Sequence, residues 1–335
     1  MGPSGLVRKI GYSQVSQSNF MAGISLKCDS VGNVYYLMQF VDPDAGDTSP
    51  LYKFERIGDF TFGAVTNVPI YMPYQQFFGQ DVKQFLISKD DGQIVTLTLN
   101  DAPANCLTME MMSAIQLEID RVSESQEHKM VVLESSNDKI FCSGHSFKEV
   151  NEMISNEDKK SQELLFAECS KMLMKIRNSP KIFVAKVRGI ATAGGLGLVS
   201  IMDCVFASKT ARFALGGINF NFGCHQPSVS VSRSISPKNT MELLVSGLPL
   251  NAERSQEAGL INEFLDDDKL DERVNNFCKQ VCGHTPQVLS LTKDTLYKQI
   301  SMPIDQAYNF ASQAMVDNLQ MPETKKGVQL FLKKD

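Results

Sequence analysis

The stretch GIATAGGLGLVSIMD at residues 189–203 is the part of the sequence from which the fold can be inferred. The run IFVAKV at 182–187 before it is apolar and rich in branched residues, which is typical of a buried strand, and the apolar run behind the glycines is typical of a helix. The glycines therefore occupy a strand-to-helix turn. Gly194 and Gly195 can expose backbone N–H groups there, at the positive end of a helix. Such a turn can hold a phosphate or the oxygen of an activated carbonyl.

On the residues alone, three interpretations of this turn stay open. Gly195 and Gly197 suggest a dinucleotide fingerprint, but the third glycine would fall at Ser200 and no ribose-binding acid is placed correctly behind it. The second interpretation is a tight turn with a purely structural role. The third is an oxyanion hole, which needs a second donor. Residues 141–150 (FCSGHSFKEV) can supply one, because they also follow a short strand-like run, at 130–133.

Composition limits the kind of protein. The chain has 335 residues, of which 43% are hydrophobic and 21% charged, as expected of a soluble globular protein. A net charge of -5 and a pI near 5.5 argue against nucleic acid as a partner, because neutralising phosphates needs a basic face. No apolar run reaches 18 residues, so we expect no transmembrane segment. Eight cysteines without CxxC pairs indicate reduced thiols in a reducing compartment.

The start of the chain has the composition of a mitochondrial import segment. Arg8, Lys9 and Lys27 occur there with several serines, and no acidic residue precedes Asp29. We therefore expect a mitochondrial protein, on the matrix side, that keeps this segment.

A change of pattern divides the chain near residue 80. Residues 1–80 carry many aromatic side chains between turn signals and have no sustained helical period. They predict short strands and loops, forming an extension that lies on another surface and not a free domain. Residues 81–335 predict one domain, with alternating strands and helices over 81–250 and helices over 251–335.

The elements of this second part follow from periodicity and from proline and cap positions. Met112, Ile115, Ile119 and Val122 share one face of a predicted helix. The predicted strands cover residues 94–99, 130–133, 182–187, 204–207 and 212–215, and the other predicted helices cover 161–176, 236–246, 251–258, 269–282, 286–300, 303–318 and 322–332.

From about residue 85 to the end, the sequence resembles the crotonase (enoyl-CoA hydratase/isomerase) superfamily. The resemblance is carried by the segments at 101–107, 141–148 and 189–203, by SGLPLNA at 246–252 with EAGLI at 257–261, and by LYKQ at 296–299 with SQAMVDNL at 312–319. It implies an α/β fold, the crotonase ββα spiral with a C-terminal helical region. It also implies assembly as trimers or dimers of trimers.

Members of this family hold a thioester carbonyl with two backbone N–H groups. The resemblance implies that His145 and Gly194 supply these donors here. Fixed backbone dipoles stabilise the negative charge that the carbonyl oxygen gains as an enolate forms. The imidazole of His145 is expected to be a partly buried polar group without a catalytic role.

The catalytic carboxylates of the family are missing. A hydratase of this family uses two glutamates as general acid and base, and the resemblance places them at Gly197 and Gly217. Glycine cannot transfer a proton. Cys224 and His225 follow nearby, but a lone cysteine or histidine without a placed partner is more often structural. We assign no residue to metal binding.

The resemblance also implies contacts with a CoA thioester, and no tightly bound cofactor. Ala104 and Phe147 match positions that line the CoA site, and Lys148 matches one that reaches the nucleotide phosphates. Phe331 and Lys334 match a pair that packs on the adenine and its phosphate from a neighbouring subunit.

Two hypotheses follow. In the first, the protein has lost hydratase activity and serves as a structural or accessory subunit of a larger mitochondrial assembly, for example a membrane complex of the respiratory chain. It would then form a homotrimer or a hetero-assembly through residues 1–80. In the second, it is an active CoA-thioester enzyme of fatty-acid metabolism, an isomerase, hydratase or thioesterase that uses other residues, such as His225 or Cys224.

Overall fold

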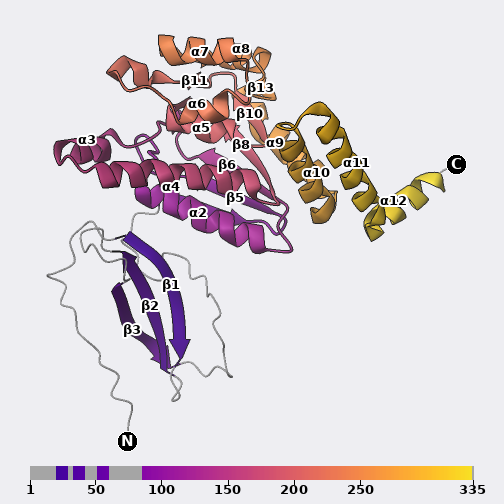
Figure 1. The fold of residues 1–335 in the computed structure, drawn as a ribbon, viewed down its shortest axis with the longest axis horizontal. Coiled ribbons are helices and arrows are strands. Elements are labelled where there is room, and N and C mark those ends of the chain that lie inside the picture. The colour runs from indigo at the N-terminus through magenta and orange to yellow at the C-terminus, as the bar shows by residue number, and fades with distance from the viewer. Residues whose placement is uncertain (1–19, 29–32, 42–50, 60–84, 334–335) are drawn as a thin grey trace, which may run out of the picture. The chain divides into compact units, whose positions relative to one another are not determined.

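The computed structural model of the protein describes residues 20–28, 33–41, 51–59 and 85–333 (Figure 1). The chain divides into two compact units, Met1–Val82 and Lys83–Asp335, which are considered one at a time. Over the described residues, no helix is long and apolar enough to cross a membrane.

The first unit contains an antiparallel sheet of three strands in the order β1-β2-β3. They are β1 (Phe20–Cys28), β2 (Asn33–Val41) and β3 (Leu51–Asp59). Each has nine residues, so these strands are longer than the short ones that the sequence predicted. Of the basic residues at the start of the chain, Lys27 lies in β1, whereas Arg8 and Lys9 and the turn signals near residue 43 lie outside the described residues.

The second unit is built on two sheets. The larger has six strands in the order β13-β10-β8-β6-β5-β4, and only the edge pair β4 and β5 is antiparallel. Central parallel strands are covered on both faces, which explains why the run MVVL in β6 is buried throughout. The strands are β4 (Leu86–Asp90), β5 (Ile94–Leu99), β6 (Met130–Ser135), β8 (Ile182–Val187), β10 (Cys204–Ser208) and β13 (Glu263–Leu265).

The smaller sheet has four short strands in the order β12-β11-β9-β7. It contains β7 (Ile140–Cys142), β9 (Ile190–Thr192), β11 (Arg212–Ala214) and β12 (Leu250–Asn251). The strand predicted at 182–187 ahead of the glycine turn is confirmed as β8, but a further strand lies between it and the turn. The chain first enters the smaller sheet as β9, which has only three residues and so shows no period. Both sheets therefore meet at the turn.

Twelve helical segments complete the described part of this unit. They are α2 (Met109–Glu124), α3 (Phe147–Ser155), α4 (Lys159–Asn178), α5 (Gly194–Ser200), the 3-10 helix η2 (Gly216–Phe220), α6 (Pro227–Val231), α7 (Pro237–Ser246), α8 (Ala252–Glu257), α9 (Asp267–Cys282), α10 (Pro286–Gln299), α11 (Ile304–Gln320) and α12 (Pro322–Leu332). Helices α3, α6 and η2 were not predicted, because each is too short for a clear helical period.

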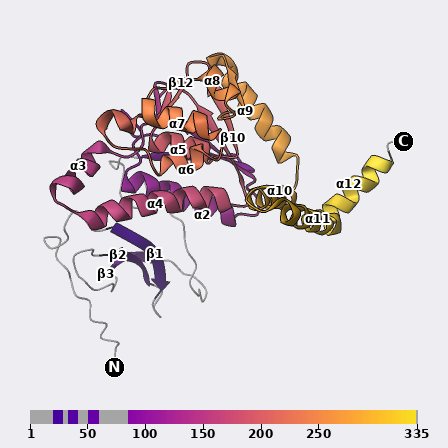
Figure 2. The same cartoon turned by 45° about the horizontal axis from the view of Figure 1, so that its top comes forward.

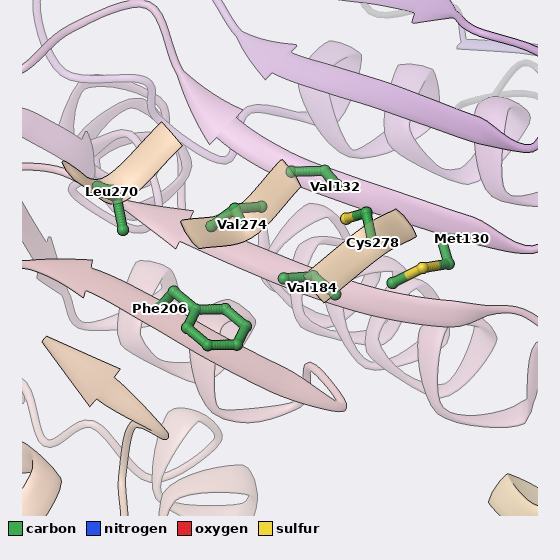
Figure 3. Close-up of a cluster of buried hydrophobic side chains, with 7 residues drawn as sticks. All are labelled: Met130, Val132, Val184, Phe206, Leu270, Val274 and Cys278. Carbon is green, nitrogen blue, oxygen red and sulfur yellow. The ribbon is translucent and has the colours of Figure 1, made fainter. Parts of the chain in front are cut away.

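Helix α9 covers one face of the larger sheet. Leu270, Val274 and Cys278 recur every four residues and form its buried stripe. Figure 3 shows this stripe against side chains from three neighbouring strands. Those side chains are Met130 and Val132 of β6, Val184 of β8 and Phe206 of β10. Burial of each large apolar side chain contributes about 1.5–3 kcal/mol, so this layer fixes the strands that carry the glycine turn.

Helices α10 to α12, residues 286–332, form what we call the C-terminal arm. In both views α11 and α12 run away from the two sheets (Figures 1 and 2). Lys293 is the buried residue of α10, and α11 and α12 bury no residue. Apolar side chains on the arm are therefore open, among them Ile304, Tyr308, Met315 and Phe331, which are 70–75% exposed.

Lys293 attaches this arm to the body of the unit. Its ammonium group donates to the carbonyls of Ile176 (3.0 Å) and Lys181 (2.8 Å). It also forms a buried ion pair with Asp203, at 2.8 Å. A lysine is almost never fully buried unless it is paired, and here every donor direction finds an oxygen.

Candidate functional site

The candidate site lies where the end of β7 meets the start of α5. Gly144, after β7, has a φ of +85°, and a Cβ placed on it would lie 2.6 Å from the backbone nitrogen of Gly194. Only glycine fits such a backbone approach. The structure thus brings together the two segments that the sequence singled out, 141–150 and 189–203.

The two predicted donors, the N–H groups of His145 and Gly194, are neighbours in this turn. A Cβ placed on Gly194 would lie 3.7 Å from the nitrogen of His145. Neither N–H donates a hydrogen bond to another residue in the described part of the chain. Gly194 is the first residue of α5, where backbone donors have no partner inside the helix. Two adjacent free donors are the arrangement that a developing oxyanion needs.

The backbone of Ala193 sets the orientation of the second donor, the N–H group of Gly194. Its φ of 50° and ψ of -120° lie in a region that residues with a side chain rarely adopt. Its N–H donates to the carbonyl of Ala214 in β11, at 3.0 Å, which fixes the turn against the smaller sheet. Backbone strain of this kind costs about 1–3 kcal/mol and tends to occur at functional sites.

The predicted CoA loop lies beside the first donor. The N–H of Ser143 donates to the carbonyl of Ala104 (3.1 Å), and the N–H of Leu107 donates to the carbonyl of Gly144 (2.8 Å). The loop therefore places Ala104 beside Ser143, in the same segment as the first donor. This juxtaposition agrees with the family resemblance and could not be derived from spacing.

Asn105 holds that loop in place, a role that the sequence analysis missed. It is buried, with a φ of 47°. Its side-chain oxygen accepts from the N–H of Asp101 (2.7 Å), and its amide donates to the carbonyl of Phe141 (3.1 Å). The only signal was an asparagine in a loop, which is common in left-handed backbone.

The ring of His145 is held away from solvent. Its Nδ1 lies 3.2 Å from the carbonyl oxygen of Leu107, and its centroid lies 5.4 Å from that of Phe166, edge to face. Nε2 is buried and has no hydrogen-bond partner among the described residues. Burial lowers the pKa of His145, so the ring is neutral at pH 7.

The two positions that would carry glutamates are closed. A Cβ on Gly217 would lie 2.2 Å from the carbonyl oxygen of Phe222 and 2.9 Å from Sγ of Cys224. A Cβ on Gly197 would lie 3.1 Å from Cα of Pro227, which begins α6. Neither backbone position has room for a larger side chain without movement of its neighbours.

The proposed substitutes are not prepared for proton transfer. Burial raises the pKa of the Cys224 thiol, so it is protonated at neutral pH. The His225 side chain is exposed and packs against Gly223.

A carboxyl group near the first donor has a shifted pKa. Glu149, half-buried on the first turn of α3, has a pKa raised to about 7 by burial and by neighbouring carboxylates such as Glu110. Its Oε2 is buried without a partner in the described chain.

The predicted CoA residues separate into two groups. Phe147 and Lys148 open α3, directly after the first donor, and the half-exposed ring of Phe147 meets that of Phe220 edge to face at 5.2 Å. Phe331 is exposed on α12, and the C-terminal arm carries it away from the donors (Figures 1 and 2). Lys334 lies outside the described residues.

Comparison with known proteins agrees with this geometry. A family model described as enoyl-CoA hydratase/isomerase matches residues 89–335. The rat protein named "Enoyl-CoA hydratase domain-containing protein 3, mitochondrial" is 32% identical over 246 residues, which span 73% of this chain and 81% of that protein.

Solved structures give the same result. The crystal structure of human enoyl-CoA hydratase domain-containing protein 3 superposes with a TM-score of 0.72 at 30% identity, covering 75% of this chain and 98% of its own. An enoyl-CoA hydratase from Mycobacterium smegmatis also gives 0.72, at 33% identity, covering 75% and 97%. These likenesses confirm the predicted crotonase fold.

Proposed function

The chain belongs to the enoyl-CoA hydratase/isomerase family, and we propose that it is a member without hydratase activity that still binds an acyl-CoA thioester and serves as an accessory subunit of a mitochondrial assembly. One observation carries the loss of activity. The positions at Gly197 and Gly217 lack the carboxylates, and at Gly217 the backbone of Phe222 also fills the space that a side chain would need. Losing one placed acid or base typically costs about 100- to 10,000-fold in rate, and here two are absent.

The direct test is the hydration of crotonyl-CoA by the purified full-length protein. We expect a rate no higher than that of a buffer blank with heat-denatured protein. A turnover close to that of an active hydratase measured in parallel would overturn this proposal.

Retained thioester binding is supported by the donor pair. His145 and Gly194 have free N–H groups, and neither depends on a side chain. Lys148 lies on the exposed first turn of α3, where an ammonium group can reach a phosphate. Calorimetry with a non-hydrolysable acyl-CoA should give weaker, less salt-sensitive binding for Lys148→Ala, and unchanged binding for the exposed control Lys160→Ala. Wild-type affinity in the first variant would remove Lys148 from the site.

The C-terminal arm supports self-association. Its apolar residues are too numerous and too exposed for a free surface, since large exposed apolar patches usually mark interfaces. In a homotrimer the arm of one subunit would bring Phe331 and Lys334 to the CoA of its neighbour. Sedimentation of the purified protein should give three chains per particle, and a stable monomer would exclude this arrangement.

The first unit supports attachment to a partner. A sheet of three strands has two edges, β1 and β3, whose backbone groups can pair with another chain. We expect the host to be mitochondrial, since the similar rat protein is named so, and to lie on the matrix side, in a complex such as one of the respiratory chain. Deleting residues 1–80 should leave a folded protein that no longer co-sediments with that complex. Normal assembly of the truncated form would contradict the attachment role.

Glu149 supports a second candidate, an active isomerase or thioesterase. A carboxyl group with a pKa near 7 is suited to general acid or base catalysis at neutral pH, and this one lies four residues after the first donor. If such turnover exists, Glu149→Gln should lower it about 100-fold or more, whereas the exposed control Glu127→Gln should not. Absence of any turnover with acyl-CoA substrates would leave the accessory role as the conclusion.

A further inference from the structure

A cavity lies at the opposite end of α5 from the donor turn. It has a volume of about 230 Å³, far more than the roughly 10–15 Å³ that one water requires. Its wall comes from the ends of α4, α5 and α6, from the turn after α8, and from α10 of the C-terminal arm. Neither His145 nor Gly194 lines it, so it is separate from the donor turn.

Two arginines give this cavity positive charge. Arg177, in the last turn of α4, places its guanidinium carbon 3.2 Å from the ring centroid of Tyr297. Arg233 follows α6, and one of its nitrogens donates to the carbonyl of Val229 at 2.9 Å, which leaves further donors of the same group open. Guanidinium groups bind oxyanions through parallel N–H bonds. Neither arginine forms an ion pair with another residue in the described chain.

Asp203 adds an acceptor to the same wall. Its Oδ2 is occupied, because it pairs with Lys293 and accepts from the N–H of Phe183, both at 2.8 Å. Its Oδ1 is buried and has no hydrogen-bond partner among the described residues. An unpaired buried carboxylate oxygen is costly unless a donor reaches it. A ligand that offers an O–H or N–H group as well as negative charge would satisfy this oxygen, in competition with the hydroxyl of Tyr297, which also contacts Asp203.

We propose that this cavity binds inorganic phosphate, with Arg177 and Arg233 holding its charged oxygens and Asp203 accepting its O–H. At neutral pH inorganic phosphate keeps at least one proton, so it supplies both the anion and the donor. Sulfate is fully deprotonated, and a phosphate monoester is largely so. Both would place a charged oxygen against the unpaired carboxylate oxygen. The Asp203 geometry thus selects phosphate from anions of nearly the same size and shape.

The cavity and the candidate site lie at opposite ends of α5. The helix has seven residues, with the Gly194 donor at its first and Ser200, in the cavity wall, at its last. The cavity also touches the arm through Tyr297. Bound phosphate would therefore stabilise the contact between the arm and the body of the unit. This inference does not depend on the proposed function, since no thioester contact enters it.

The test is calorimetry of the full-length protein with sodium phosphate, sodium sulfate and methyl phosphate at equal ionic strength. We expect phosphate to bind at least about tenfold more tightly than either of the other anions. Arg233→Gln should weaken phosphate binding about tenfold, as expected when a charge-assisted hydrogen bond is lost. The control Arg254→Gln, an exposed arginine on α8 outside the cavity, should change nothing. Acyl-CoA binding should be the same in both variants.

Asp203→Asn replaces an acceptor with a donor and should abolish the preference for phosphate over sulfate. If that variant fails to fold, the comparison of the two anions on the wild-type protein still tests the role of Asp203. Equal affinity for phosphate and sulfate would overturn that role. No detectable binding, or unchanged binding in Arg233→Gln, would overturn the site.

Discussion

Restoring the two missing glutamates should not restore hydratase activity. The change is the double variant Gly197→Glu, Gly217→Glu. A Cβ at residue 217 would lie 2.2 Å from the Phe222 oxygen, whereas ordinary contacts lie at 3.4–4 Å, so the backbone at residue 222 must move by more than about 1 Å. Residue 197 is less tight, at 3.1 Å from Pro227. Overpacking of this kind costs about 1–3 kcal/mol at each site, and the Gly217 change should cost more.

Thermal unfolding and a hydration assay together measure this prediction. Each kcal/mol lowers Tm by about 2–4 °C in a unit of this size, so the double variant should melt about 4–24 °C below wild type. Crotonyl-CoA hydration should stay at background, because the displaced carboxylates would not flank the donor pair. The single variant Gly217→Ala isolates the steric effect, since it adds the Cβ without the carboxylate. It should already show most of the decrease in Tm that the double variant shows.

Gly327 provides the matched control. It lies inside α12, and a Cβ there would meet nothing within 4 Å. Gly327→Glu should therefore be neutral, or stabilising by up to about 1 kcal/mol through helix propensity. The reasoning would be refuted by a double variant that melts at the wild-type temperature and hydrates crotonyl-CoA within about tenfold of an active hydratase.

Three further outcomes are expected. Lys293→Met leaves Asp203 buried without a counter-charge, so it should lower the free energy of unfolding by about 3–5 kcal/mol in a denaturant titration. The control Lys298→Met breaks an exposed ion pair and should lower it by less than about 1 kcal/mol. The folded-state pKa of Glu149 lies above its unfolded value of 4.5, so the folded state binds the proton more tightly and stability falls as pH rises from about 4.5 to about 7. Glu149→Gln should hence raise Tm at pH 8 but not at pH 4, and the exposed Glu127→Gln, which is not among the carboxylates that act on Glu149, should do neither. Equal Tm changes at both pH values would show that the carboxyl is not perturbed. Met315→Glu, on the open face of α11, should leave circular dichroism unchanged but reduce the particle mass in sedimentation, and an intact oligomer would exclude that face as the interface.

Long periodic elements could be predicted from the sequence, as could short ones with a clear cap or turn signal such as α8, but several other short ones could not. The strand at 94–99 alternates in burial along its whole length, so its pattern carries the assignment. The helix predicted at 161–176 is longer in the structure, from Lys159 to Asn178, because its capping aspartate, Asp158, precedes the apolar period. The strand β9 and the helix α3 have too few residues for a period. Tertiary pairing alone explains them.

The same limit applies to the site. Glycine and histidine at the right places suggested two donors, and the resemblance supplied their pairing. No local pattern revealed that Asn105 fixes the neighbouring loop, because its partners lie as far as 36 residues away. Nor could the sequence reveal that the space at Gly217 is filled, since Phe222 reaches it through the fold of η2. Residue types show which chemical groups are available, and packing determines which of these groups reach the site.

The difference between the two halves of the site explains how one function can persist without the other. The carbonyl-binding half consists of backbone N–H groups, held by the meeting of β7, β9 and α5 and by the strained turn at Ala193. These groups survive any side-chain replacement that keeps the turn. The proton-transfer half requires two side chains and the room for them. With glycine at residues 197 and 217, α6 and the segment after η2 pack closely against the backbone, and that packing opposes the introduction of carboxylates. Under the proposed function, a chain of this design would bind a thioester oxygen through its backbone while the packing around residue 217 prevents hydratase chemistry.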